Sequence, residues 1–464
     1  MLRNTYFKQL FILLVILINT SCEDYLEVDT PKHKIVSATV FEEDETAIST
    51  MTGIYNELLN ADFSGGWNYS VSVLGGLSSD VLEPVNPNSV SYAEFNQNEI
   101  SPDSEFNFYL WSSTFNIIYM TNALLEGLSQ SEGVSEEISK QLEGEARFIR
   151  AFTYFYLVNL YGDVPLILST DYEQNSLIAR EGQEQIYELI IDDLQASIEL
   201  LENTTSETRT RADKFVVTAM LARVYLYLGN WEQAEFLSSQ VIAESSKYEL
   251  LENLDEIFLP ESKEAIWQIS PVGRGNILTS TNEGLAYVGS SFSSFKISDE
   301  FVNSFNSEDK RLTSWIGFYT NATRSFHFPY KYKDGSSISN ITEYSMVLRL
   351  AEQFLIRAEA RAQTGYFSGA INDLDKIRTR SNLESISGSD LEINQENLIS
   401  LILEERKREL FSEWGHRWLD LKRTNRASSV LGHLSDSWED TDILYPIPEM
   451  DRMKNPNLTQ NDGY

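Results

Sequence analysis

Cysteine is almost absent from this sequence. The 464-residue chain contains one, Cys22, so no disulfide can form within it and no four-thiolate metal site can be built. Its four histidines lie far apart, and none has the HExxH spacing of a metalloprotease. The chain also lacks a phosphate-binding glycine loop followed by lysine, and it lacks a GxSxG nucleophile turn. We therefore expect no metal site and no cofactor.

Basic residues are scarce relative to acidic ones. The chain has 36 Lys and Arg against 70 Asp and Glu, which gives a formal net charge of −34 at pH 7. Proteins that bind nucleic acids need clustered Lys and Arg on the phosphates, so this balance argues strongly against a nucleic-acid partner. The excess of carboxylates instead favours solubility and repulsion from anionic surfaces.

Long apolar runs are also missing. The run Leu10–Ile18 is too short to span a bilayer, but with Arg3 and Lys8 before it the pattern is that of a signal peptide. The small and polar residues that follow lead directly into Cys22, which resembles the acylated cysteine of a bacterial lipoprotein lipobox. We predict that residues 1–21 are a lipoprotein signal peptide and that the mature chain is anchored by lipid alone. The alternative is a plain signal peptide with an incidental cysteine.

Two segments, Asp213–Ile242 and Arg349–Arg378, share one helical plan. Each contains an apolar helix, a break at glycine and a second amphipathic helix. The small residues that match at identical spacing are Ala222, Gly229 and Ala234 in the first segment, and Ala358, Gly365 and Ala370 in the second. This pattern is typical of a tetratricopeptide-type hairpin. Because one hairpin cannot bury its own faces, other helices must stack on it.

Further helical patterns occupy much of the remaining chain. They cover Glu43–Leu59, a long segment from about Glu105, Glu136–Tyr161, Gln185–Leu201, Met346–Gly365, Ser368–Ser381 and Gln395–Trp414. We predict a mainly α fold: tetratricopeptide-like helical hairpins stacked in one body, with loop-rich excursions that carry a few short strands. Within it, residues 22–40 form a lipidated tether and extended leader, residues 41–250 an N-terminal helical part, and residues 251–464 a C-terminal part.

The two excursions, residues 60–105 and 252–344, interrupt the helical pattern. Both are rich in polar residues and Gly, yet both carry many aromatic side chains. In the second, Ala265, Trp267 and Ile269 alternate as in a short strand. Loops this long inside a compact domain are usually functional, so we expect the binding surface there.

The run Glu404–Arg423 interleaves charges with aromatic and aliphatic side chains. The spacing Glu409–Glu413–Arg417 predicts complementary charges one helical turn apart. Two interpretations are open: Arg–carboxylate pairs that lock a helix and its turn against the bundle, or a catalytic acid/base cluster. The interleaved aromatic residues favour the buried latch.

Other carboxylates give weaker signals. The group Asp436, Glu439, Asp440 and Asp442 could hold Ca²⁺, but it lacks the glycine and ordered alternation of an EF-hand, so a solvated loop is favoured. A glycosidase needs two positioned carboxylates, and nothing in the sequence singles out a particular pair.

Five segments resemble signature sequences of the SusD/RagB family. They are the lipobox cysteine Cys22, Gly144–Leu166 (GEARFIRAFTYFYLVNLYGDVPL), Leu348–Ala360, Glu409–Arg423 and Tyr445–Tyr464. They occur in the family's order and bracket nearly the whole mature chain. The resemblance implies an outer-membrane lipoprotein of Bacteroidetes-type bacteria, lipid-anchored at the cell surface, with a tetratricopeptide-like fold and a glycan-binding face.

The resemblance also implies partners. Family members act as lids on a SusC-like TonB-dependent transporter and deliver oligosaccharide to its pore, or peptide in the RagB branch, without catalysis. The acidic pair Glu23 and Asp24 resembles the surface-export signal of such lipoproteins. A secreted glycan-degrading enzyme and a purely protein-binding repeat scaffold are the competing functions.

Sugar binding requires exposed aromatic rings beside a few carboxylate or amide groups. We predict a shallow site drawn from both excursions, in which the aromatic rings stack on sugars while Asp80 and Asn96 form hydrogen bonds. The alternative is that most of these residues only pack beneath the loops. The site residues are Trp67, Tyr69, Asp80, Tyr92, Phe95 and Asn96 in the first excursion, and Tyr287, Trp315 and Tyr319 in the second.

Overall fold

The computed structural model describes residues 40–204, 208–274, 279–338, 340–389, 393–435 and 437–464. The predicted signal peptide, nearly all of the predicted tether and the lipidation site Cys22 lie outside the described residues. Within those ranges, no helix is both long enough and apolar enough to cross a bilayer.

The two predicted hairpins are present. The first consists of α10 (Lys214–Tyr227) and α11 (Trp231–Ala243), and the second of α15 (Leu350–Gln363) and α16 (Phe367–Arg380). The turn glycines have φ values of +69° at Gly229 and +84° at Gly365, in the left-handed region where glycine is favoured. Helix α11 packs on α15, so the two hairpins stack directly although more than 100 residues separate their equivalent positions. The tetratricopeptide-like prediction is confirmed.

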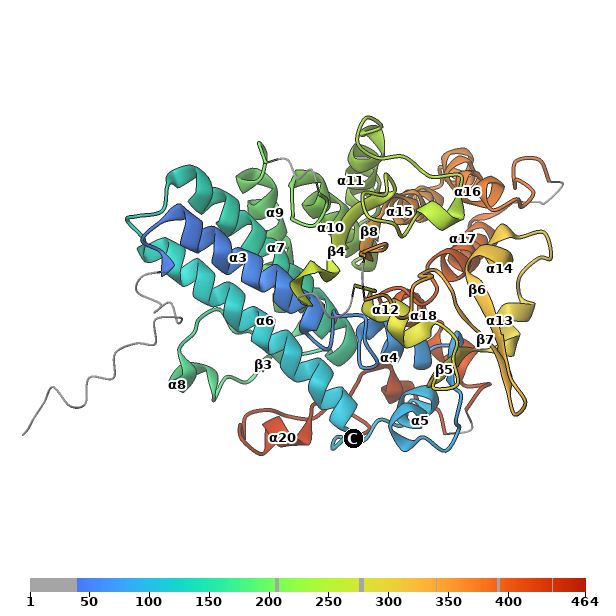
Figure 1. The fold of residues 1–464 in the computed structure, drawn as a ribbon, viewed down its shortest axis with the longest axis horizontal. Coiled ribbons are helices and arrows are strands. Elements are labelled where there is room, and N and C mark those ends of the chain that lie inside the picture. The colour runs from blue at the N-terminus through green and yellow to red at the C-terminus, as the bar shows by residue number, and fades with distance from the viewer. Residues whose placement is uncertain (1–39, 205–207, 275–278, 339, 390–392, 436) are drawn as a thin grey trace, which may run out of the picture.

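Long helices extend this stack on the N-terminal side. They are α3 (Asp44–Asn60), α6 (Glu105–Gln130), α7 (Glu136–Tyr161) and α9 (Gln183–Leu200). Helix α7 packs between α6 and α9, and α9 leads on to α10 (Figure 1). Because α7 has neighbours on several sides, its C-terminal half is buried almost completely, including charged Arg150. On the other side, α17 (Gln395–Glu409) packs against α15 and α16.

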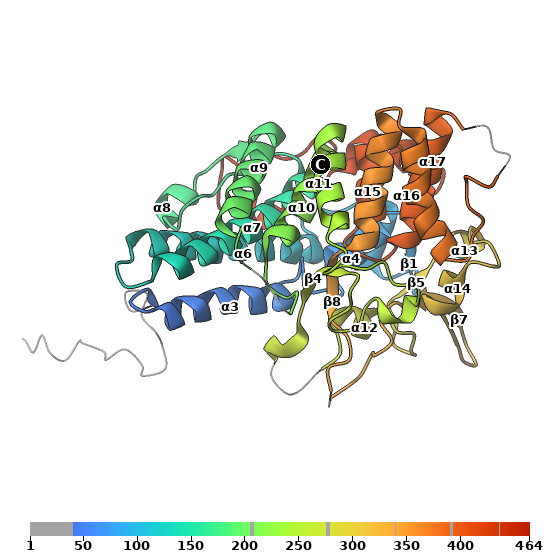
Figure 2. The ribbon, with the colours of Figure 1, turned by 90° about the horizontal axis from the view of Figure 1, so that it is seen from above.

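The strands of the described chain form four short antiparallel pairs. They are β1 (Leu82–Pro84) with β5 (Phe295–Ile297), β2 (Val164–Pro165) with β3 (Arg180–Glu181), β4 (Ala265–Ile269) with β8 (Ser345–Arg349), and β6 (Ile316–Thr320) with β7 (Ser325–Pro329). The predicted strand at Ala265–Ile269 is confirmed. In Figure 2 the hairpin β6–β7 and α9 lie on opposite sides of the helical stack.

Shorter helices fill the excursions and the C-terminal region. They are α4 (Val71–Leu77), α5 (Val90–Gln97), α8 (Tyr172–Asn175), α12 (Asn282–Tyr287), α13 (Asp299–Asn303), α14 (Lys310–Ser314), α18 (His416–Arg423), α19 (Ala427–Leu431) and α20 (Glu449–Arg452). Single 3-10 turns occur at Leu254–Glu256, Pro271–Arg274 and Asp440–Ile443.

Three local predictions were wrong. The first excursion contains helix α4, although the sequence shows no helical pattern there. The pattern is missing because α4 is buried on every side and therefore has no amphipathic period. The predicted helix Met346–Gly365 begins as strand β8, whose residues are all buried, and becomes helical only at Leu350. The predicted helix Gln395–Trp414 ends at Glu409, after which the chain turns before α18.

Candidate functional site

The two excursions meet in the structure. Strand β1 of the first pairs with β5 of the second, and the Ser298 amide donates to the Val81 carbonyl at 2.9 Å. The Asn282 side chain also donates to the carbonyls of Leu59, at 3.2 Å, and Gly65. Segments more than 200 residues apart in the chain are therefore joined directly.

Four of the predicted stacking residues are buried. Phe95 and Trp315 are 0% exposed, Tyr287 is 2% exposed and Tyr92 is 9% exposed. Their rings pack on other rings: Phe95 contacts Tyr445 edge to face with centroids 5.4 Å apart, and Tyr92 contacts Phe295 at 5.2 Å. A sugar cannot stack on a ring without an exposed face, so the prediction is wrong for these four. They pack beneath the loops, as the alternative interpretation stated.

The Trp315 side chain is fully occupied by contacts within the protein. Its indole N–H donates to the Leu254 carbonyl at 3.2 Å, and the Lys331 ammonium lies 4.6 Å from the ring centroid. A cation at this distance is attracted by the ring face. Both the polar end and the face of the indole are therefore occupied by the protein itself.

The Asp80 carboxylate forms ion pairs with side chains of two helices, α17 and α18. It accepts from Arg417 Nε at 2.7 Å and from Lys407 Nζ at 2.6 Å. Burial by itself would raise the pKa of Asp80, but the hydrogen bonds and charges of Arg417 and Lys407 outweigh it and lower the pKa to about 2. The Asp80 carboxylate is therefore a charged anchor between the first excursion and α17–α18, and its predicted hydrogen bond to a sugar stays a prediction.

Asn96 is half-buried and has a similar structural use. Its amide nitrogen donates to the carbonyls of Leu77 at 3.4 Å and Leu82 at 3.3 Å. With Asp80 it lines a small cavity of about 160 Å³, so the structure does bring this predicted pair together. The amide nitrogen is engaged in positioning the chain between α4 and β1, and the predicted sugar contact of Asn96 stays a prediction.

Trp67 and Tyr69 are accessible, as a stacking role requires. The Trp67 side chain is 37% exposed, and Tyr69 is half-buried. Tyr69 packs against the start of α6, with its ring centroid 4.4 Å from that of Phe106 and 5.5 Å from that of Tyr109. The rigid helix therefore supports this aromatic group from behind.

Two polar side chains lie in the same loop. Asn68 is half-buried, and so is Asp62, whose pKa is raised by partial burial and by the nearby charge of Glu57. No described residue forms a hydrogen bond or ion pair with the Asp62 carboxylate. The pKa of Tyr109 is raised, chiefly by its hydrogen bond to Glu105 and more weakly by the charges of Tyr69 and Asp62. Asp62 thus lies near the aromatic group with its hydrogen-bonding capacity unused.

Sequence reasoning missed Asp62 and Tyr109. Asp62 lies two residues after the end of α3, in the loop that leads to α4, and Tyr109 falls off the buried stripe of α6 that contains Leu110, Trp111 and Thr114. An aromatic residue on the polar side of an otherwise regular helix was the available signal.

A second accessible aromatic group lies on the hairpin β6–β7. Phe318 is 60% exposed and packs on His327 with ring centroids 5.0 Å apart, while Tyr319 is half-buried against Phe326 at 5.3 Å. Phe292, on the neighbouring loop, is 91% exposed. Tyr319 is therefore the one predicted residue of the second excursion whose ring is accessible.

The charged run Glu404–Arg423 is a buried latch. Arg349 donates to Glu264 at 3.0 Å, Glu409 at 2.6 Å and Glu413 at 2.8 Å. Burial opposes ionisation of Glu409, but the surrounding arginines hold its pKa well below the ordinary range. A carboxylate so firmly ionised cannot deliver a proton near neutral pH, which disfavours the catalytic interpretation.

The predicted spacing inside that latch was wrong in one respect. Glu413 lies in the turn after α17, so Glu409, Glu413 and Arg417 are not successive turns of one helix. Arg417 reaches Asp80 instead. Among the described residues, the latch included, no cluster of three or more His, Cys, Asp or Glu could hold a metal ion. Of the acidic group considered for Ca²⁺, Asp436 lies outside the described residues, while Glu439 and Asp442 cap a 3-10 turn.

Comparison with known proteins identifies the family. Residues 24–226 match a family described as "Starch-binding associating with outer membrane", and residues 307–464 match the SusD family. These two ranges together cover more than three quarters of the chain. The chain belongs to the SusD/RagB family. The SusD-like protein P25 of Formosa agariphila is 25% identical to it over 519 aligned residues, with 96% of each chain covered.

Solved SusD-family structures share the whole fold. A SusD superfamily protein from Bacteroides vulgatus superposes with a TM-score of 0.80 at 20% identity, covering 92% of this chain and 100% of the other. A laminarin binding SusD-like protein superposes with a TM-score of 0.75 at 22% identity, covering 91% and 100% respectively. The overall fold of this SusD-family chain is thus shared with these structures at low sequence identity.

Proposed function

We propose that this protein is a cell-surface lipoprotein that captures oligosaccharides and passes them to a SusC-like TonB-dependent transporter without cleaving them. The observation that supports it is the contact between Tyr69 and Tyr109, with exposed Trp67 two residues before Tyr69 in the same loop and the unpaired carboxylate of Asp62 nearby. A structural neighbour named as a laminarin binding SusD-like protein agrees with this proposal.

The chemistry of this group suits a sugar. The exposed Trp67 indole offers a flat apolar face to the C–H side of a pyranose ring. Asp62 and Asn68 offer a carboxylate and an amide to the hydroxyl groups at the ring's edge. Tyr319 and Phe318 on the hairpin β6–β7 would contact a more distant unit of a longer oligosaccharide.

Titration of laminarin oligosaccharides into purified protein tests the site. We expect Trp67→Ala to weaken binding by about 10- to 30-fold, since loss of a central aromatic contact costs about 1.5–2 kcal/mol. Phe236→Ala is the matched control, because Phe236 is 56% exposed on α11 and lies outside both excursions. Phe318→Ala shows whether the ligand extends to the hairpin.

Three outcomes would contradict the proposal. Equal affinity of the wild type, Trp67→Ala and Tyr69→Ala for every bound glycan would remove the aromatic group as the site. Binding of peptides with no glycan bound in an array screen would favour the peptide-binding RagB-type function. Release of shorter sugars from polysaccharide by the purified protein would establish the alternative of a glycan-degrading enzyme.

The anchor and the transporter need separate tests. We expect metabolic labelling with a fatty acid to mark the wild type in the outer-membrane fraction and to fail for Cys22→Ala. Co-purification with a TonB-dependent barrel from solubilised membranes tests the partner. Recovery of unlabelled wild-type protein from the cytosol would refute the anchored location.

A further inference from the structure

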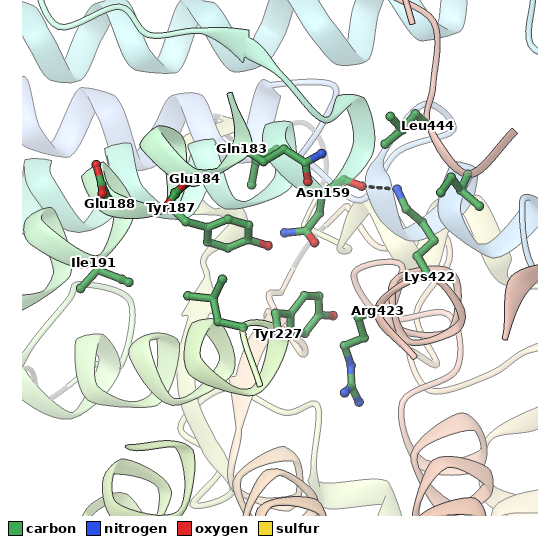
Figure 3. Close-up of a pocket in the computed structure, with 13 residues that line it drawn as sticks. Asn159, Gln183, Glu184, Tyr187, Glu188, Ile191, Tyr227, Lys422, Arg423 and Leu444 are labelled. Atoms are coloured by element: carbon green, nitrogen blue, oxygen red, sulfur yellow. Dashed lines mark hydrogen bonds between the residues drawn. The ribbon is translucent and has the colours of Figure 1, made fainter. Parts of the chain in front are cut away.

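A cavity of about 610 Å³ lies away from the aromatic excursions. Its walls come from the C-terminal part of α7, from α9, from the end of α10, from α18 and from the segment around Leu444 (Figure 3). None of its lining residues belongs to either excursion. A ligand held there would therefore not compete for Trp67 or Tyr319.

Lys422 extends its amine along one wall. The ammonium donates to the Asn159 carbonyl near the C-terminal end of α7, where helix carbonyls lack intrahelical partners (Figure 3). No described carboxylate lies within ion-pair distance of it, which is unusual for a lysine whose burial lowers its pKa to about 7. Because an ammonium has three donors, this contact leaves two for another acceptor.

Tyr227 contributes a second unused polar group. Its hydroxyl is buried without a hydrogen-bond partner in the described structure. In Figure 3 the hydroxyl ends of Tyr187 and Tyr227 both point toward the side of the cavity that holds Asn159 and Lys422. A buried unpaired hydroxyl costs free energy, so a ligand that bonds to it is favoured.

The neighbouring cation is not available for a ligand. Arg423 donates to Glu359 at 2.6 Å and to Asp420 at 2.7 Å, and its guanidinium lies 5.4 Å from the Tyr227 ring centroid. Figure 3 shows it pointing away from Lys422. Lys422 is therefore the cationic group of this cavity that lacks a carboxylate, among the residues described.

The remaining walls define the rest of the ligand. The rings of Tyr187 and Tyr227, with Ile191 and Leu444, offer apolar surface. Exposed Glu184 and Glu188 on α9 offer carboxylates, which accept hydrogen bonds from hydroxyl groups. A ligand that uses all three features has an acid group, a ring with an apolar face and several hydroxyls.

We propose that this cavity binds an acidic monosaccharide unit, a uronate, whose carboxylate pairs with Lys422 and accepts a hydrogen bond from Tyr227. The ring packs against the two tyrosines, and its hydroxyls donate to Glu184 and Glu188 at the mouth. The uronate is either a free monosaccharide or the terminal unit of an oligosaccharide. This inference is independent of the glycan site around Trp67.

Saturation-transfer NMR and calorimetry on the purified mature protein test it, with D-glucuronate, D-galacturonate and neutral D-glucose as probes. We expect at least one uronate to bind and glucose to bind at least tenfold more weakly. We expect Lys422→Met to reduce uronate affinity at least tenfold and Tyr227→Phe several-fold. Lys140→Met, at the exposed start of α7, is the matched control and leaves affinity unchanged. Tighter binding of an oligosaccharide that ends in the uronate identifies the terminal unit as the source.

The absence of saturation transfer to both uronates would overturn the proposal, as would equal affinity for glucose. Unchanged uronate affinity in Lys422→Met, when its circular dichroism spectrum shows that it is folded like the wild type, would also overturn the proposal. If Lys422→Met does not fold, Tyr227→Phe decides, because it removes a single oxygen atom that has no protein partner. Trp67→Ala should leave uronate binding intact and Lys422→Met should leave laminarin binding intact, so the two sites can fail separately.

Discussion

The ion pairs of Asp80 provide a direct test of how the excursions are fixed to the helical stack. Asp80 lies just before β1, whereas its partners Lys407 and Arg417 lie in α17 and α18. The side chains are only 11%, 9% and 9% exposed, so water screens these charges weakly. The substitution Asp80→Asn keeps the shape and one acceptor oxygen but removes the charge.

The expected loss can be worked out in two ways. Removal of one partner from a buried ion pair costs about 3–5 kcal/mol, and the retained acceptor favours the lower end. Independently, a fall of the Asp80 pKa from 3.8 to about 2 corresponds to roughly 2 kcal/mol at neutral pH. We therefore expect a loss of about 2–3 kcal/mol, or a Tm lower by about 2–3 °C for a chain of 464 residues.

The pH dependence has a defined sign. Because the folded-state pKa of Asp80 is depressed, its contribution is complete above the ordinary pKa of 3.8 and declines as the pH falls toward about 2. Calorimetric melting at pH 7 and near pH 2.5 should show the difference between wild type and Asp80→Asn shrinking in acid. Asp192→Asn is the control, because Asp192 is exposed on α9 and forms no ion pair within the described chain.

A double-mutant cycle completes the argument. Combined with Arg417→Gln, Asp80→Asn should show a coupling free energy of at least about 1 kcal/mol, since the two side chains touch. Additive effects, or a Tm difference at pH 7 no larger than that of Asp192→Asn, would refute the view that this carboxylate anchors the excursion.

Two further predictions concern the helical stack. Gly365→Ala should lower the free energy of unfolding by about 1–2 kcal/mol. The cause is backbone strain at a φ of +84°, since an added Cβ meets no atom within 4 Å and therefore causes no clash. Gly365→Asn should cost less, and equal denaturation midpoints for the wild type and both variants would contradict this prediction. Arg223 joins α10 to α15 through Glu352, with bonds of 2.6 and 2.7 Å and both side chains 1% exposed. Arg223→Met should therefore lower stability by about 3–5 kcal/mol, whereas a restored midpoint in Arg223→Met with Glu352→Met would identify the lone carboxylate as the cause.

Local sequence signals predicted the helical part well. The spacing of small residues around Gly229 and Gly365 depends on the turn itself. It therefore predicts the hairpin without knowledge of the helices that pack on it. The interleaving of charges and aromatic residues around Glu409 likewise indicated burial. Where burial is complete on all sides, as in α4 and β8, periodicity disappears, and the element type could not be read from the pattern.

The candidate site was less predictable. Aromatic residues in a long loop either line its surface or pack beneath it, and composition is the same in both cases. Trp67 and Trp315 differ only in what surrounds them: one is 37% exposed, while the other is covered by Leu254 and Lys331. Asp80 had the same ambiguity, because its cationic partners come from more than 300 residues away.

The sequence by itself indicated the repeated helical hairpins, the family and the many aromatic residues of the two excursions. Each of these features is a pattern of residues close together in the chain. Tertiary structure decided which rings and carboxylates remain free. That choice depends on the pairing of β1 with β5 and on contacts between the excursions and α17–α18. Such contacts join residues that are distant in the chain, so the local sequence does not show which rings and carboxylates they cover.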